Sequence, residues 1–595
     1  MNPRVKRWRE LLFFAVMGGV GIFLIWKCRY GFANRDEAFY LTVPYRLCQG
    51  DGLVGQEWHL SQLPGVLLVP FVAGYLKLVG STEGIFLAAR YFCTAMWWIA
   101  GLYFYFSLRK YSKVGAMAVS LFFVLYIPFG IMAFSYNSMG ILTLLLSLIL
   151  FLKGTERQNF LEKEGTFVGR MGTSARGAFL LSGLFFSWSV LCCPYLAVGY
   201  VLYLLWALQP VFEAERKQKR REAALFFTLG AAGSGALFLV FLLSRNSWKE
   251  ILAAIPWMLQ DPEHGAVSLT AGLSRYFTQI FHSTKAAPLI CTSFGILAVF
   301  LGALPLLERG REPYRGIRQC CLLAACGLTL WYLASVLLEK PRLNYLMFPV
   351  NLLGLLCLLI EATPKKRMFF RIFYLPGMFY SLCISFASNQ KFYAIASAST
   401  VALAGSVMII GEEVRELRRL QSVLAVEGAG KRTVGSAALF LIGFCFLFQV
   451  GAEGYLRYHT VFWEPSMKEQ NCLIQEGPEA GILASQEKKD SYQSMMEDTR
   501  TVWEEAEGKP VLYLSKLTWL YFFGATECAS YSAWTSGVNQ LTMERLEAYY
   551  HQNPEKLPVC VYAEAQYEKE ADWFCANYGY EKEQTPLGGW KLKHP

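Results

Sequence analysis

The sequence predicts an all-α polytopic membrane protein of about thirteen transmembrane helices, followed by a C-terminal extracytoplasmic α/β domain. Two observations predict this fold class. Hydrophobic residues make up 54% of the 595 residues and charged residues only 17%, whereas a soluble chain has about 25% charged residues. The charges are also unevenly spread, because residues 451–595 contain 13 basic and 22 acidic residues and the first 450 contain 43 and 23. The net charge of +11 therefore combines +20 in a membrane domain, 1–450, with −9 in the tail, and it does not indicate a nucleic-acid-binding surface.

Apolar segments that can cross a bilayer recur along the first 450 residues. A membrane core of about 30 Å needs about 20 apolar residues per helix, and fewer where a span is short. We expect the first segment to remain as an anchor, because no small-residue cleavage site follows its basic start. The expected spans are 10–27, 84–106, 114–134, 137–152, 178–192, 195–209, 223–243, 287–307, 319–338, 345–361, 372–388, 392–411 and 435–450.

Positive charges in the connections between spans predict the orientation. Short loops rich in Lys and Arg stay on the cytoplasmic side. With the N-terminus in the cytoplasm, the inner connections hold 30 Lys and Arg residues and the outer ones hold 11. We therefore expect a multi-pass protein of the cell membrane with a cytoplasmic N-terminus and an extracytoplasmic C-terminal domain.

Two long loops are expected on the outer face together with the tail. The first outer loop, 28–83, is too apolar to be disordered, and we expect interfacial helices at 38–47 and 63–79. The second outer loop covers 244–285 and carries aromatic anchors typical of a membrane interface.

The tail, 451–595, alternates short apolar runs with helical stretches, which is typical of a small α/β sheet. It contains no nucleophile pattern, so we expect a covering domain without its own catalytic centre. A disulfide among its four cysteines stays open, because sequence alone cannot pair them. The expected strands are 481–484, 511–514 and 559–562, and the expected helices are 486–507, 541–552 and 565–577.

An acidic pair, Asp36 and Glu37, follows the first span in the first outer loop. A carboxylate at the membrane surface can act as a general base toward an acceptor hydroxyl or amide, provided that its surroundings tune its pKa. The alternative is helix capping, because acids at a helix N-terminus are stabilised by the helix dipole.

The sequence around this pair resembles a known family. Asp36-Glu-Ala-Phe-Tyr40 in a long first outer loop, followed by the proline-containing segment Leu60 to Pro70, is similar to the membrane glycosyltransferases of the C superfamily. That superfamily includes protein O-mannosyltransferases, aminoarabinose transferases of lipid A and catalytic subunits of oligosaccharyltransferases. The resemblance implies a polyprenyl-phosphate-linked sugar donor, inverting transfer and Asp36 as the general base. We expect Glu37 to assist or orient this reaction.

One departure from the family pattern concerns metals. Several relatives carry a second acid in the next outer turn, where this chain has Phe134-Ser-Tyr-Asn-Ser138. Two carboxylates that hold a metal are therefore not implied, and a divalent metal stays open as the only cofactor. A neutral Asn137 suits hydrogen bonds to sugar hydroxyls, and we expect Tyr40 and Tyr136 beside it in the substrate site.

Other polar residues of the outer face are candidates for substrate binding. His59 and Gln62 can line a sugar or acceptor site, since His59 and Glu57 have poor zinc spacing and lack a third ligand. Exposed loop residues are the alternative. Arg90 lies inside the second span, where a charge is costly and usually functional. A structural ion pair with an acid of the first loop is the other interpretation of Arg90. His264, in the second outer loop, is a candidate acceptor contact, although Asp261-Pro262 beside it also simply favours a turn.

A lipid-phosphate leaving group needs positive charge at the outer face. Arg342 is the best candidate, with Lys340 beside it and Arg275 in the preceding loop. The alternative is that these side chains snorkel at helix ends.

These observations predict a glycosyltransferase that moves a hexosyl or pentosyl group from a polyprenyl-phosphate donor to a glycan, lipid or protein acceptor, with membrane lipids around it and no nucleic-acid partner. Two other classes stay open. A lipid or polysaccharide transporter would carry ionisable residues along the depth of the membrane, and a non-enzymatic receptor would use the tail as its binding module.

Overall fold

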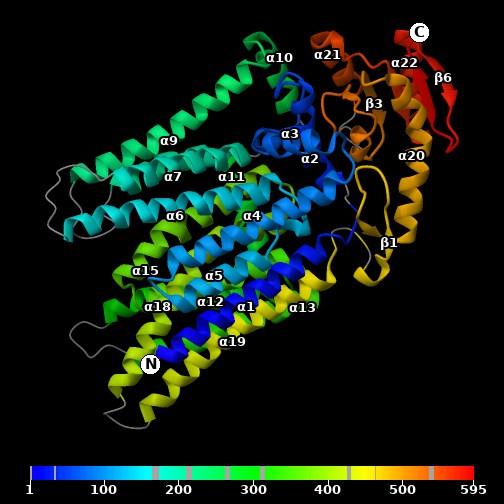
Figure 1. Ribbon diagram of the computed structural model, residues 1–595. Helices are drawn as coiled ribbons and strands as arrows, with labels where there is room; N and C mark the ends of the chain where they lie inside the picture. Colours follow the sequence, from blue (N-terminus) through cyan, green and yellow to red (C-terminus); the bar gives the residue numbers. More distant parts are fainter. Residues whose placement is uncertain are drawn as a thin grey trace.

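The computed structural model describes residues 3–32, 35–163, 173–208, 217–260, 268–307, 315–424, 430–461, 464, 466–534 and 542–594. Long helices lie side by side in one bundle, and a small domain with a sheet covers one end of it (Figure 1). The N-terminus lies at the other end of the bundle (Figure 1). The bundle and the small domain are therefore arranged end to end (Figure 1).

Within the described residues, eleven helices are long and apolar enough to cross a membrane, and twelve if the pair α17 and α18, bent by 50°, counts as one span. Each matches an expected span. The thirteenth expected span, 195–209, is a short apolar segment, Pro194–Leu205, that follows a break after α7. The helices of the bundle are α1 (Pro3–Lys27), α4 (Ile85–Leu108), α5 (Lys113–Leu125), α6 (Tyr136–Lys163), α7 (Thr173–Cys192), α8 (Gly199–Leu208), α9 (Lys217–Leu243), α12 (Ala287–Leu307), α13 (Arg315–Glu339), α14 (Met347–Ile360), α15 (Pro364–Phe369), α16 (Leu375–Ala387), α17 (Lys391–Ala398), α18 (Thr400–Leu424) and α19 (Gly430–His459).

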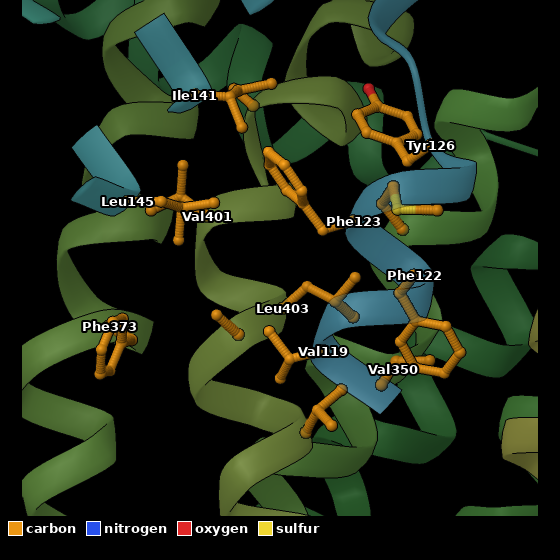
Figure 2. Packing of buried hydrophobic residues seen from close by; sticks show 14 of the residues in the cluster. Val119, Phe122, Phe123, Tyr126, Ile141, Leu145, Val350, Phe373, Val401 and Leu403 are labelled. Atoms are coloured by element: carbon orange, nitrogen blue, oxygen red, sulfur yellow. The ribbon is translucent and has the colours of Figure 1, made fainter. Parts of the chain in front are cut away.

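The centre of the bundle is a packed apolar core. Figure 2 shows side chains of α5, including Phe122 and Phe123, packed among residues from α6, α14 and α18. Small residues let other helices approach closely: a Cβ on Gly183 of α7 would lie 1.9 Å from the carbonyl oxygen of Phe227 in α9. Such small-residue contacts are how helices associate where lipid provides no hydrophobic driving force.

The first outer loop is largely helical, as predicted, and the second contains two helices that were not predicted. The first contains α2 (Arg35–Gln49), a 3-10 turn (Leu63–Leu68) and α3 (Val69–Val79). The second contains α10 (Trp248–Leu259) and α11 (Leu269–Phe281). Ser247 and Glu250 form a capping box at the start of α10, which satisfies two backbone donors and fixes where that helix begins.

The tail folds as an α/β domain, as predicted. Its five-stranded sheet has the order β4-β3-β5-β7-β6, with β3 parallel to β4 and β5 and the remaining pairs antiparallel. The expected strand 481–484 is instead β2, paired with β1 outside this sheet. The elements are β1 (Cys472–Leu473), β2 (Leu483–Ala484), α20 (Gln486–Ala506), β3 (Pro510–Leu514), the 3-10 turn η7 (Thr518–Phe522), β4 (Glu527–Cys528), α21 (Met543–Gln552), the 3-10 turn η8 (Pro554–Lys556), β5 (Cys560–Ala563), α22 (Glu568–Tyr578), β6 (Glu581–Gln584) and β7 (Trp590–Lys593).

The first outer loop and the tail share one hydrophobic core. Phe39 and Trp58 of the loop belong to the same buried cluster as Leu512 and Val561 of the tail sheet. The last bundle helix also continues to His459, beyond the boundary expected at 450. The small domain at the end of the bundle is therefore built from the first loop and the tail together.

Candidate active site

The acidic pair lies in the first turn of α2, where it was expected. Successive residues of a helix are about 100° apart, so Asp36 and Tyr40, four residues on, lie on nearly the same face. Glu37 lies on a different face. The two adjacent carboxylates therefore meet different surroundings.

The Asp36 face is lined by aromatic hydroxyls. The rings of Tyr40 and Tyr136 lie edge to face with centroids 5.9 Å apart, and the Asp36 carboxylate acts electrostatically on both. Burial first, and then Tyr136 and Asp36, hold the pKa of the Tyr40 phenol well above its ordinary value. Asn137 is buried next to Tyr136 at the start of α6. Sequence reasoning expected these four residues in one site, and the fold brings them together.

Glu37 forms a buried ion pair with Arg90 of α4. Arg90 Nε donates to Glu37 Oε1 at 2.6 Å and Nη2 donates to Oε2 at 2.7 Å, while Nη1 donates to the carbonyl oxygen of Cys28 at 3.0 Å. Both side chains are almost fully buried. The structural alternative for Arg90 is therefore confirmed. Because both Glu37 oxygens accept from Arg90, this pair joins α2 to the ends of α1 and α4.

A cavity of about 180 Å³ opens beside this pair at the tail end of the bundle. Its walls come from segments that are far apart in sequence: the end of α1, the start of α2, α4, the loop before α6, the turn before α14 and the end of α19. The charged side chains that line it are Lys27, Glu37, Arg90, Arg342 and Arg457.

Three of these cations have no carboxylate partner among the described residues. Lys27 Nζ donates to the carbonyl oxygen of Tyr458 at 3.0 Å, and Arg342 lies over the ring of Tyr393 at 5.1 Å. Arg457 is 5% exposed, and its Nε has no hydrogen-bond partner within the part of the chain that the structure describes. A buried charge without a counterion is unfavourable, so this cavity favours an anion.

Carboxylates near the cavity do not neutralise its excess of positive charge. Glu37 forms its ion pair with Arg90, and Glu464 lies 3.9 Å from Lys488 of α20. Glu479 acts electrostatically on Arg90. The cavity therefore keeps a positive field at the position of Arg457 and Arg342.

Two expected substrate-binding residues are engaged inside the first loop. Gln62 is fully buried, accepts from the Val54 amide at 2.8 Å and donates to the carbonyl oxygen of Glu57. His59 Nδ1 lies 2.8 Å from Ser61 Oγ. The amide of Gln62 thus holds the loop together from within.

Trp58 of the same loop is engaged inside the structure as well. It is completely buried between the rings of Trp257 at 5.9 Å and Tyr531 at 5.6 Å. Its stacking partners come from the second loop and the tail, so Trp58 joins three parts of the chain.

The remaining expected cations differ in position. Lys340 Nζ donates to the carbonyl oxygen of Ser283 at 2.7 Å at the end of α11 and does not line the cavity. Arg275 donates to the carbonyl oxygen of Ser388. Only Arg342 of this set reaches the cavity, and His264 lies outside the described residues.

Sequence reasoning missed Lys27 and Arg457. Lys27 was set aside as the end of the first span, and Arg457 was counted with the tail because the apolar run stops at 450. The signal was the helical pattern that continues to His459, which puts Arg457 in the last turns of a membrane helix.

Metal and disulfide sites were left open by the sequence. Within the described ranges, no group of three or more His, Cys, Asp or Glu side chains is arranged to hold a metal ion. All sixteen cysteines are free thiols, including the four of the tail.

Comparisons with known proteins place few relatives beside this chain. No family model and no curated protein match it. The solved structures that resemble it include the archaeal oligosaccharyltransferase AglB from Archaeoglobus fulgidus in complex with an inhibitory peptide and a dolichol-phosphate, with 12% identity, 99% of this chain and 74% of that chain covered, and a TM-score of 0.45.

Two further solved structures resemble the chain over nearly its whole length. The apo form of the Archaeoglobus fulgidus oligosaccharyltransferase is 12% identical, with 100% of this chain and 75% of that chain covered and a TM-score of 0.43. ArnT from Cupriavidus metallidurans, bound to undecaprenyl phosphate, is 11% identical, with 98% of each chain covered and a TM-score of 0.39.

Proposed function

We propose that the protein is a membrane glycosyltransferase that transfers a sugar from a polyprenyl-phosphate-linked donor to an extracytoplasmic acceptor with inversion. The observation that carries this proposal is the cavity whose cations, Lys27, Arg342 and Arg457, lack carboxylate partners among the described residues. It lies against the helix that presents Asp36. A cationic cavity next to a carboxylate suits a reaction in which a phosphate leaves and an acceptor loses a proton.

The donor phosphate binds among these cations at the end of the bundle. Arginine matches phosphate oxygens with a planar fork of donors, and lysine adds a point charge. The polyprenyl chain then lies among the apolar helices, because the cavity opens at their ends. Phosphate binding provides the negative charge that Arg457 lacks.

The acceptor hydroxyl approaches the sugar from the Asp36 side. Asp36 accepts the hydroxyl proton while the acceptor oxygen forms a bond to the anomeric carbon. The bond between that carbon and the phosphate oxygen breaks, and its electron pair leaves with the polyprenyl phosphate. Arg342 and Arg457 stabilise the charge that develops on the phosphate.

The test is Asp36→Asn, assayed for transfer from a polyprenyl-phosphate sugar by the purified protein in lipid. Asn keeps the shape and can cap a helix nearly as well, but it cannot accept the proton. We expect transfer to fall about 10²–10⁴-fold. Asp572→Asn, an exposed acid of the tail, is the matched control and should keep wild-type transfer.

Near-normal transfer by a folded Asp36→Asn variant would remove Asp36 from the mechanism. Movement of the donor across the membrane without any transfer by the wild type would instead support the transporter class. Each outcome separates one interpretation from the others.

A further inference from the structure

The tail contacts the chain just before α2. The backbone amide of Gly31 donates to the carbonyl oxygen of Leu483 at 2.9 Å, and the Leu483 amide donates to the carbonyl oxygen of Arg29 at 2.6 Å. This short parallel bridge lies between the end of α1 and Asp36. It fixes where the chain enters the candidate site.

A buried ion network holds the other end of α2. Arg46, in its last turn, pairs with Asp51 and with Glu57, each at 2.7 Å. Lys556 of the tail turn η8 pairs with the same Asp51 at 2.6 Å and with Glu527 at 2.6 Å. Lys556 thus connects the last turn of α2 to the tail sheet through one carboxylate.

The network is buried and electrostatically satisfied. Lys556 is 4% exposed and Asp51 is 3% exposed. Burial alone would lower the pKa of the Lys556 ammonium, but the Asp51 and Glu527 carboxylates outweigh burial and raise its pKa. Lys556 is therefore charged at neutral pH, and a charge–charge bond in so dry a place is stronger than one at the surface.

The middle of α2 also depends on the tail. Pro44 lies inside α2 and removes a backbone hydrogen bond there. Next to it, the Tyr45 ring stacks on Phe522 of the turn η7, with centroids 5.0 Å apart. Phe522 contacts Phe86 at the start of α4 as well, so the turn η7 fills the space between the two helices.

We propose that Lys556 is a positioning residue, which holds α2 against the tail so that Asp36 stays at the correct distance from the anion cavity. The inference rests on the proposed function, because it assigns Lys556 a role in the same reaction. Lys556 touches neither the cavity nor Asp36 in the structure, so it acts through the helix.

The first experiment compares Lys556→Met, Lys556→Arg and Lys582→Met. Lys582 pairs with Asp572 and Glu568 on the far side of the tail, so it is the matched control. A small misplacement of a catalytic group costs up to about 100-fold in rate. We expect Lys556→Met to lower kcat about 10- to 100-fold with donor KM changed less than about twofold, Lys556→Arg to restore most of it, and Lys582→Met to match the wild type.

The second experiment places Lys556→Met in the Asp36→Asn background. If Lys556 acts through Asp36, the double variant has the same residual transfer as Asp36→Asn alone, because no base remains to be positioned. Full multiplication of the two losses overturns the inference and leaves the proposed function intact. Wild-type transfer by Asp36→Asn overturns the proposed function instead.

Hydrogen–deuterium exchange gives a readout that does not use activity. We expect Lys556→Met to speed amide exchange in α2 and to leave α20 and α22 unchanged. Unchanged exchange in α2, or an equal increase throughout the tail, contradicts a positioning role. Exchange also decides the case if the variant is too poorly active to assay.

Discussion

Two buried cationic sites lie at opposite ends of the bundle, and they differ in their partners. At the start of α15, Lys366 is fully buried and pairs with Glu413 and, at 2.9 Å, with Glu416. At the tail end, Arg457 is nearly as buried, but no described carboxylate pairs with it. The first site joins α15 to α18 and is complete in itself.

This difference separates structural charges from charges that face a ligand. A buried ion pair replaces the water that each charge loses, so Lys366 needs nothing further. Arg457 has lost water without a replacement, and the cavity in front of it provides room for an anion. Burial of a charge in a membrane helix is therefore a weaker sign of function than burial without a counterion.

Breaking the complete site should have the largest effect, and it should be on stability. Lys366→Met leaves Glu413 and Glu416 without their cation, which costs about 3–5 kcal/mol for a buried pair. This loss of stability is measured by unfolding the purified protein with increasing concentrations of a denaturing detergent. Lys365→Met is the neighbouring control, because its side chain is exposed and 4.0 Å from Glu412, and it should cost about 0–1 kcal/mol. Equal losses for both variants would contradict the comparison.

The incomplete site should behave in the opposite way. Arg457→Gln removes an uncompensated charge, so its unfolding midpoint should equal or exceed that of the wild type. Its sugar transfer should fall on the order of 10²–10³-fold, as when one donor to a developing charge is lost. A large loss of stability would mean that Arg457 has a structural counterion after all, and normal transfer would exclude it from phosphate binding.

The smallest effect is expected at the rim of the same cavity. Arg342 is exposed and lies over the Tyr393 ring, so water screens its charge. Arg342→Gln should lower transfer by roughly tenfold, with less dependence on salt than the wild type shows. A loss greater than that of Arg457→Gln would reverse the assignment of the two arginines.

The fold could be predicted from sequence where one property dominates. Hydropathy alone located the spans, because each must supply a nearly continuous apolar run. Strands β6 and β7 were missed, since Glu581–Gln584 has no apolar alternation and is held by pairing with β7. The last span was ended early because α19 changes from apolar to polar at 451 while its backbone stays helical.

Apart from Arg342, the candidate site could be predicted only on the Asp36 side. Asp36, Tyr40, Tyr136 and Asn137 stand in two short motifs that follow spans, and local sequence therefore indicated them. The anion cavity combines the ends of α1 and α19 with the turn before α14. No local pattern links Lys27, Arg342 and Arg457, because their proximity comes from the way the helices pack.

The shared core of the first loop and the tail has a consequence for biosynthesis. Trp58 is made early in translation. Tyr531, whose carbonyl oxygen accepts a hydrogen bond from the Trp58 amide and whose ring stacks on the Trp58 ring, is made much later. At about 5–20 residues per second, roughly 25–100 s of translation separate them. During that time the aromatic side chains of the first loop have no tail residues to pack against. The hydrophobic core beneath the acidic pair is therefore incomplete on the ribosome. The part of the chain that carries the acidic pair therefore gains the support of the tail only after Tyr531 has been made.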